Sequence, residues 1–178
     1  MDLTRDAVPV DEIRRLVPHR HEFALLDGIV YYDPETSDAV GYHDLEKDAF
    51  WVRGHIPGDP IFPGALMIEA AAQLSSFCYG KRVGKKEDRF FGFGAIDKVK
   101  FRNIVRPGQR LYVLCKLLAF HRRYAKFAVQ GIAEGSLCFE GEILGISMPS
   151  KKPPGPPPPH PRASHAGGDP GPASAGQA

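Results

Sequence analysis

The apolar positions of this chain separate one long apolar helix from two groups of alternating, strand-like segments. Residues 64–79 place apolar side chains on every face of a helix, and the body of that helix also contains Glu69 and Gln73. A helix that is apolar all round is normally enclosed by protein. We therefore expect this helix at the centre of the fold, with Gly80 as its C-cap.

Segments rich in β-branched and aromatic residues lie on both sides of this helix in the sequence. A short amphipathic helix is expected over residues 11–17, where Pro18 ends it. The expected strands are residues 24–32 and 38–44 before the long helix, and residues 90–101, 111–120, 126–133 and 136–146 after it. This order predicts an α+β fold in which an antiparallel β-sheet wraps around one long buried helix.

The composition changes abruptly near residue 149. The segment of residues 1–148 is long enough, and has enough apolar residues, to form one domain with its own core. Residues 149–178 are rich in Pro, Gly and Ala and have little apolar area to bury. We expect them to form a disordered tail.

Composition narrows the classes of protein that fit the chain. Hydrophobic residues make up 43% and charged residues 25%, which is ordinary for a globular protein. The N-terminus has no signal-peptide pattern, and the longest apolar run is shorter than the roughly 20 residues that span a bilayer. We therefore expect a cytoplasmic protein that has neither a membrane nor a nucleic acid as its partner.

The cysteines and the charges add two further expectations. Cys78, Cys115 and Cys138 lack metal-ligand spacing and are expected to be reduced core residues, so no metal site is predicted. Residues 1–69 contain 6 Lys or Arg against 14 Asp or Glu, whereas residues 70–150 contain 14 against 6. The basic second part could dock an acidic partner, or the two parts could simply neutralise each other in the fold.

The candidate chemistry is concentrated between residues 54 and 73. His55 lies in a loop stiffened by prolines, which holds a side chain in place as acid–base catalysis requires. Gly64 opens the long helix, where its N–H can stabilise an oxyanion. Glu69 lies in the apolar helix body, where a carboxylate is costly unless it is paired or protonated, and Gln73 one turn later could orient it. Each signal is weak alone, but together they predict acid–base catalysis.

This stretch resembles the signature of a known enzyme family, the β-hydroxyacyl-acyl-carrier-protein dehydratases of bacterial fatty acid synthesis. These are hotdog-fold proteins with a catalytic His/Glu pair. The resemblance rests on GHIPGDPIFPGALMIEAAAQ at residues 54–73 and extends to LVPHRHEFALLD at residues 16–27, AIDKVKFR at residues 95–102 and VRPG at residues 105–108. It covers roughly residues 10–147 and leaves out the tail.

The resemblance implies a hotdog dimer, in this family often a trimer of dimers, with each active site at the dimer interface. His55 of one subunit would remove the proton next to the thioester carbonyl, and Glu69 of the other would protonate the departing β-hydroxyl. The Gly64 N–H would hold the carbonyl oxygen, and Gln73 would belong to the substrate-binding site. No metal or redox cofactor is implied, because the phosphopantetheine arm arrives with the substrate on an acyl carrier protein.

The resemblance also singles out residues around this site. The candidate contacts for an acidic carrier protein are Lys81, Arg82, Lys98, Lys100 and Arg102. Candidates for the wall of the acyl tunnel are Phe90, Phe91 and Phe93, although such aromatic residues are more often part of the core.

Some residues depart from the family pattern without removing the catalytic pair. These are Glu22, Ile56, Ala65, Ile104 and Gln109. They leave open the acyl chain length and the choice between acyl carrier protein and coenzyme A as the carrier.

Two other functions remain open, a hotdog acyl-thioesterase and a non-catalytic acyl-binding hotdog subunit. Retention of both His55 and Glu69 favours the dehydratase over both. Relatives that also isomerise the double bond usually have Asp at the position of Glu69, which argues against isomerisation here.

Overall fold

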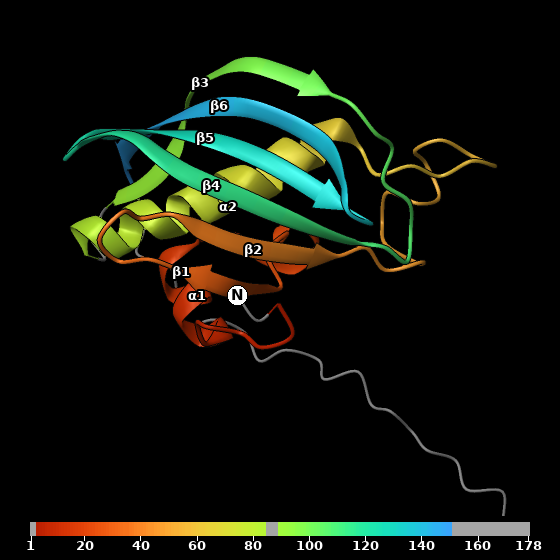
Figure 1. Ribbon diagram of the computed structural model, residues 1–178, viewed down its shortest axis with the longest axis horizontal. Helices are drawn as coiled ribbons and strands as arrows, with labels where there is room; N and C mark the ends of the chain where they lie inside the picture. The colour runs from red at the N-terminus through yellow and green to blue at the C-terminus, as the bar shows by residue number, and fades with distance from the viewer. Residues whose placement is uncertain (1–2, 85–88, 151–178) are drawn as a thin grey trace, which may run out of the picture.

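The computed structural model describes residues 3–84 and 89–150 of the 178-residue chain. Six antiparallel strands form one sheet that curves around the long helix α2 (Figure 1). The helices are α1 (Val10–Leu16), the short 3-10 helix η1 (His21–Phe23) and α2 (Gly64–Val83). The strands are β1 (Gly28–Tyr32), β2 (Ala39–Asp44), β3 (Arg89–Phe101), β4 (Arg110–His121), β5 (Tyr124–Ala133) and β6 (Ser136–Pro149). The predicted α+β arrangement is confirmed.

The two edges of the sheet differ in how they are covered. The strand order is β1-β2-β4-β5-β6-β3, so β1 and β3 are the edge strands. Val8 forms an isolated bridge with Ile29 and covers part of the β1 edge. The β3 strand pairs with β6 alone, and its side chains Phe93 and Ile96 are 41% and 44% exposed. An open edge strand that exposes large apolar side chains is a surface suited to another chain.

The core lies between the sheet and α2. Ala70, Ala71, Leu74 and Phe77 of this helix are fully buried, so α2 is enclosed as its apolar composition predicts. It contacts β2, β3, β4, β5 and β6. The helix begins at Gly64, as predicted, and carries the residues after it into the protein interior.

The predicted C-cap at Gly80 is wrong. The helix continues through Gly80 to Val83, and Gly84, with a φ of 74°, follows its last residue. A Cβ at position 80 would lie 3.2 Å from Cδ2 of Leu16. Close packing of α1 against α2 therefore gives a reason for glycine at position 80, and the helix end is set by the glycine four residues later.

The first expected strand is shorter than predicted. Residues 24–27 form no strand, and the strand begins at Gly28. The backbone N–H of Leu25 donates to the Gln73 side chain of α2 instead of to a neighbouring strand. The remaining strands fall within a few residues of the predicted ranges, as is usual for element ends.

The other expectations from the sequence have mixed outcomes. Cys78, Cys115 and Cys138 are buried free thiols, as predicted. Within residues 3–84 and 89–150, no helix is long and apolar enough to cross a membrane. The expected disordered tail lies outside the described residues from residue 151 onward, and β6 runs to Pro149.

Candidate active site

The His55 side chain is held by its own loop. Its Nδ1 lies 2.9 Å from the carbonyl oxygen of Ile61, and the Ile61 N–H donates to the His55 carbonyl at 3.2 Å. Because a carbonyl only accepts hydrogen bonds, the proton of the neutral ring lies on Nδ1. The Nε2 atom of His55 then carries a lone pair and can accept a proton.

The loop that carries His55 is anchored at several points. The His55 N–H donates to the Trp51 carbonyl at 2.8 Å, and the Phe62 N–H donates to the Val105 carbonyl at 2.7 Å. Asp59, in the middle of the loop, forms an ion pair with Arg106. These contacts, together with the loop prolines, position the imidazole before any ligand arrives.

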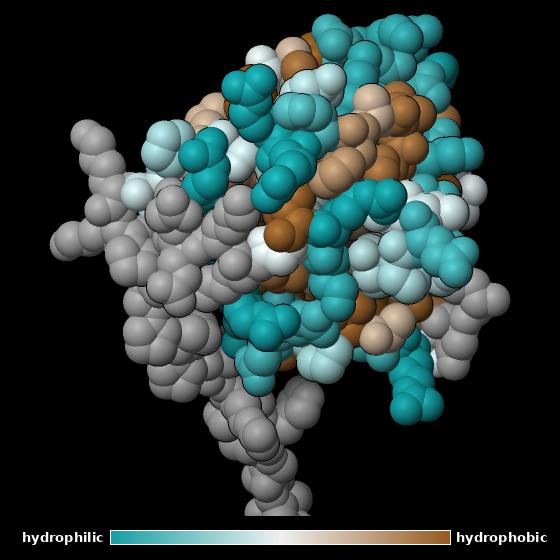
Figure 2. Space-filling view, turned by 90° about the vertical axis from the view of Figure 1, so that its left-hand side faces the viewer, coloured by the Kyte–Doolittle hydropathy of each residue, from teal (hydrophilic) through white to brown (hydrophobic). Residues whose placement is uncertain are grey.

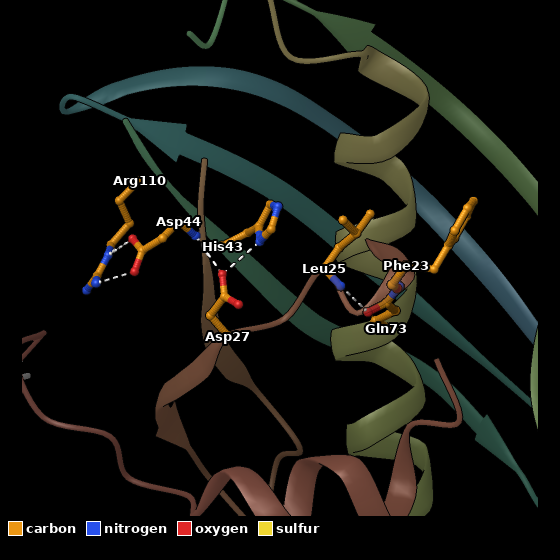
Figure 3. A network of polar contacts seen from close by, with 7 residues as sticks. All are labelled: Phe23, Leu25, Asp27, His43, Asp44, Gln73 and Arg110. Carbon is orange, nitrogen blue, oxygen red and sulfur yellow. Dashed lines mark hydrogen bonds and ion pairs between the residues drawn. The ribbon is translucent and has the colours of Figure 1, made fainter. Parts of the chain in front are cut away.

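A second polar network supports the loop from the other side. Asp27 accepts hydrogen bonds from His43 Nδ1 at 2.8 Å and from the Asp44 N–H at 2.7 Å, and Asp44 in turn pairs with Arg110 (Figure 3). The His43 ring lies 5.7 Å from the ring of Phe62, the residue that leads into α2. The network therefore ties β2 and β4 to the segment that joins the His55 loop to the helix.

The N-terminus of α2 presents backbone N–H groups that the helix itself does not use. The first bonds of the helix run from the N–H groups of Leu66 and Met67 to the Pro63 carbonyl, and no side chain caps this end. The Gly64 N–H precedes these bonds and lies at the positive end of the helix dipole. The arrangement is suited to a developing negative charge.

Glu69 and Gln73 lie one turn apart on α2 and are in contact. The Gln73 amide nitrogen donates to Oε1 of Glu69 at 2.9 Å and to the Phe23 carbonyl at 2.7 Å, while its oxygen accepts from Leu25 N–H at 3.0 Å. Figure 3 shows the Gln73 side chain directed toward the backbone of Phe23 and Leu25. The Glu69 side chain is 17% exposed. It is therefore half-buried and oriented by Gln73.

His19 is a member of the site for which no role was predicted from the sequence. Its Nε2 lies 3.1 Å from Oε1 of Glu69. Burial lowers the pKa of His19, and the nearby Glu69 carboxylate opposes this effect. The residue belongs to the PHR segment that follows α1, and 50 positions separate it from Glu69 in the sequence. Only the presence of that segment in the family resemblance could have drawn attention to it.

Glu69 and His19 open onto an apolar cavity of about 500 Å³. Its walls come mainly from β3, β6 and α2, and they include Phe90, Phe91 and Phe93. Phe90 and Phe93 are 41% exposed, so they are not core residues. The cavity combines an apolar wall with a carboxyl group and an imidazole, which suits a ligand that has an aliphatic chain and one reacting polar centre.

A second cavity of about 450 Å³ adjoins the first, because Pro18, Ser76, Phe90 and Phe91 line both. Arginine side chains surround it, contributed by α1, β3 and the turn between β4 and β5; they are Arg14, Arg15, Arg89, Arg122 and Arg123. The face where α2 and the β4–β5 hairpin end shows apolar surface among hydrophilic side chains (Figure 2). The joined cavities therefore lead from Glu69 toward a positively charged mouth.

The basic residues predicted to dock the carrier do not line the second cavity. Of the five, Lys81, Arg82, Lys98 and Arg102 make hydrogen bonds or ion pairs within the chain. Lys81, Lys98 and Arg102 pair with carboxylates, whereas Arg82 donates to the uncharged oxygens of Ser37 Oγ and the Glu35 carbonyl. The arginines at the mouth of the second cavity were not predicted from the sequence, because α1 and the β4–β5 turn come together only in the folded chain.

The two predicted catalytic groups occupy different surroundings within one chain. His55 lies in the loop before α2, and Glu69 lies inside the helix beside His19. Among the described residues of one chain, no hydrogen bond or ion pair joins His55 to Glu69. The predicted base and the predicted acid thus lie at separate places in one chain, each with its own supporting contacts.

Comparisons with known proteins identify the family of the chain. Residues 17–143 match the FabA-like domain family. The 3-hydroxyacyl-acyl-carrier-protein dehydratase FabZ of Syntrophotalea carbinolica is 35% identical over 138 residues, which cover 78% of this chain and 93% of that protein.

Solved structures show the same fold at low identity. The dehydratase heterocomplex ApeI:P from Xenorhabdus doucetiae matches with a TM-score of 0.65 and 17% identity over 78% of this chain and 91% of that one. A mutant of the thioesterase PA1618 from Pseudomonas aeruginosa matches with a TM-score of 0.61 and 10% identity over 82% and 98%. The expected hotdog fold is confirmed. From its sequence match and its architecture, the chain belongs to the FabA-like family.

Proposed function

We propose that this protein is a hydro-lyase that dehydrates β-hydroxyacyl thioesters to trans-2-enoyl thioesters in fatty acid biosynthesis. The observation that carries the proposal is the hydrogen bonding of the His55 ring together with the position of the Glu69 carboxyl group. His55 presents an Nε2 that can accept a proton, and Glu69 presents a carboxyl group on an apolar cavity. Membership of the FabA-like family and the name of the 35% identical relative support the same reaction.

The reaction moves only protons and one hydroxyl group. His55 Nε2 removes a proton from the carbon next to the thioester carbonyl, and the electron pair shifts toward the carbonyl oxygen. The Gly64 N–H stabilises the negative charge that develops there. The electron pair returns to form the double bond, and the β-hydroxyl group leaves as water with the proton that Glu69 donates. His55 then releases its proton and Glu69 regains one. No metal or redox cofactor takes part.

In this proposal a second copy of the chain brings the two groups together. The open β3 edge, with Phe93 and Ile96 exposed, is the surface that we assign to this dimer. A two-fold axis beside β3 would place the wall of each cavity against the partner subunit. His55 of one subunit would then face Glu69 of the other. Further association into a trimer of dimers is compatible with this arrangement.

We propose an acyl carrier protein as the carrier of the substrate. The phosphopantetheine arm and the acidic surface of such a carrier are both anionic. The arginines at the mouth of the joined cavities, including Arg122 and Arg123, offer a complementary charge. The apolar cavity beyond them would take the acyl chain.

The thioesterase alternative has weaker support. The match to PA1618 at 10% identity shows the fold alone. A thioesterase would release free thiol from an acyl thioester, whereas a dehydratase run in reverse hydrates an enoyl thioester and leaves the thioester bond intact.

The test is a hydration assay on crotonyl thioesters with the full-length protein, followed by the loss of enoyl absorbance. The wild type should hydrate the substrate without releasing thiol. The His55→Ala and Glu69→Gln variants should each lose about two or more orders of magnitude in kcat while keeping the oligomeric state of the wild type. Unchanged activity in both variants, or thiol release without hydration, would contradict the proposal.

A further inference from the structure

The segment that carries His19 is fixed to α1 at one end and to α2 at the other. The Arg20 guanidinium donates to the carbonyls of Val17 at 2.7 Å, His19 at 2.7 Å and Arg14 at 2.8 Å. At the other end, the Gln73 amide donates to the Phe23 carbonyl. A side chain on a segment held in this way has little freedom to move, so its contact with α2 is preorganised.

His19 and Gln73 approach the same oxygen atom of Glu69. The His19 Nε2 lies 3.1 Å and the Gln73 Nε2 lies 2.9 Å from Oε1, and neither contact uses Oε2. Oε1 accepts a hydrogen bond from Gln73 and lies at ion-pair distance from His19 Nε2, which favours the form of Glu69 in which Oε1 is the acceptor and Oε2 carries the proton. The geometry therefore distinguishes the two oxygens of Glu69.

His19 is suited to this contact as a neutral donor. Burial is the main cause that lowers its pKa, and the charge of Arg20 acts in the same direction, whereas the charge of Glu69 opposes them. A cationic imidazole would stabilise the ionised carboxylate and work against a general acid. A neutral imidazole with its proton on Nε2 can donate to Oε1 and still leave Glu69 able to hold a proton.

We propose that His19 is a positioning residue that, with Gln73, fixes the Glu69 carboxyl through Oε1 and leaves Oε2 to deliver the proton to the β-hydroxyl group. This inference rests on the proposed function. It adds His19 to Glu69 and Gln73 as a third polar group around the proposed general acid, and it assigns Oε2 as the oxygen that donates the proton. The His19 side chain itself does not exchange a proton with the substrate.

Three substitutions at position 19 in the full-length protein test the role. His19→Gln places an amide N–H near the former Nε2, His19→Asn places one near the former Nδ1, and His19→Leu removes the donor. His19→Asn and His19→Leu should lower kcat for crotonyl thioester hydration about 10- to 100-fold with KM changed less than twofold. His19→Gln should restore kcat to within about fivefold of the wild type. His121→Leu, at the exposed end of β4, is the matched control and should keep wild-type kcat.

The pattern across the variants decides the outcome. A merely structural role would lower thermal stability and affect Gln and Asn alike. Full activity of His19→Asn, or equal losses in His19→Asn and His19→Gln, overturns the inference even if His19→Leu does not fold. A wild type without hydratase activity contradicts the proposed function and this inference with it. An active wild type with an equally active His19→Asn contradicts only the role of His19.

Discussion

The Phe101 ring of β3 lies directly against Gly64 at the start of α2. A Cβ at position 64 would lie 2.7 Å from Cε1 and Cζ of this ring, closer than real carbon contacts allow. The ring is 53% exposed within one chain, so the chain itself leaves it room to shift away from an added methyl group. Glycine at this position therefore keeps both the ring and the helix N–H groups where the proposed oxyanion site needs them.

We predict that Gly64→Ala lowers activity without much loss of stability. Alanine favours the helix and Phe101 can yield, so the free energy of unfolding should change by less than about 1 kcal/mol. The added methyl group and the displaced ring should lower kcat/KM about tenfold or more. Denaturant unfolding and the hydration assay measure the two effects. Gly54→Ala is the stability control, since nothing lies within 4 Å of its added Cβ. A kcat/KM within twofold of the wild type would contradict this prediction.

Removal of the Gln73 side-chain amide should affect both stability and activity. Gln73 is 1% exposed and satisfies the Phe23 carbonyl and the Leu25 N–H, which Gln73→Leu would leave without these partners. We expect a loss of about 2–4 kcal/mol in the free energy of unfolding, because two buried backbone groups lose their hydrogen bonds. Activity should fall as well, because Glu69 loses one of its two fixed neighbours. Denaturant unfolding that shows a loss under 1 kcal/mol would refute the structural part of this prediction.

The arginines at the mouth of the joined cavities predict a specific effect on the KM for carrier-bound substrates. In an Arg122→Ala/Arg123→Ala variant, KM for a carrier-bound enoyl substrate should rise about fivefold or more and depend less on salt. The kcat for a short thioester without a carrier should not change. Lys116→Ala, on the outer face of the sheet, is the control. If the control variant raises KM as much as the arginine variant does, the carrier docks elsewhere.

The lowered pKa of His19 predicts how stability depends on pH. Folding places the pKa of His19 below its ordinary value of 6.5, so the unfolded chain binds more protons between the two values. The stability associated with neutral His19 is complete above the unfolded pKa and is lost as the pH falls through the folded pKa. The wild type should therefore lose more unfolding free energy than His19→Gln between about pH 7.5 and about pH 5. Parallel pH profiles for the two proteins would show that His19 makes no such contribution.

The sequence predicted the parts of the structure that depend on local pattern. The apolar composition of residues 64–79 indicated an enclosed helix, and the alternating segments on both sides of it indicated the strands of an antiparallel sheet. The pairing of β3 with β6 instead of with its neighbour in sequence, β4, was not predicted. The contact between Glu69 and Gln73 was also accessible, because residues four positions apart share a helix face. Periodicity is enough where the partners are near in sequence.

The features that the sequence missed depend on tertiary contacts. Gly80 matches the pattern of a C-cap, but the presence of glycine at this position is explained by the close approach of Leu16 from α1. His19 reaches Glu69 across 50 residues, and no local spacing predicts that pairing. Leu25 belongs to a strand-like segment, yet a side chain of α2 takes its hydrogen bond. In each case a residue distant in sequence decides the outcome.

The shared active site can be tested by mixing two inactive subunits. A His55→Ala chain and a Glu69→Gln chain, unfolded and refolded together, assort into homodimers and mixed dimers. If His55 of one subunit works with Glu69 of the other, each mixed dimer has one complete site. The mixture should then recover about a quarter of wild-type hydratase activity, because random assortment makes half of the dimers mixed. Each variant refolded alone should stay inactive. Recovery near a quarter is the result we predict, and a mixture that contains mixed dimers yet remains as inactive as either variant alone would contradict the account.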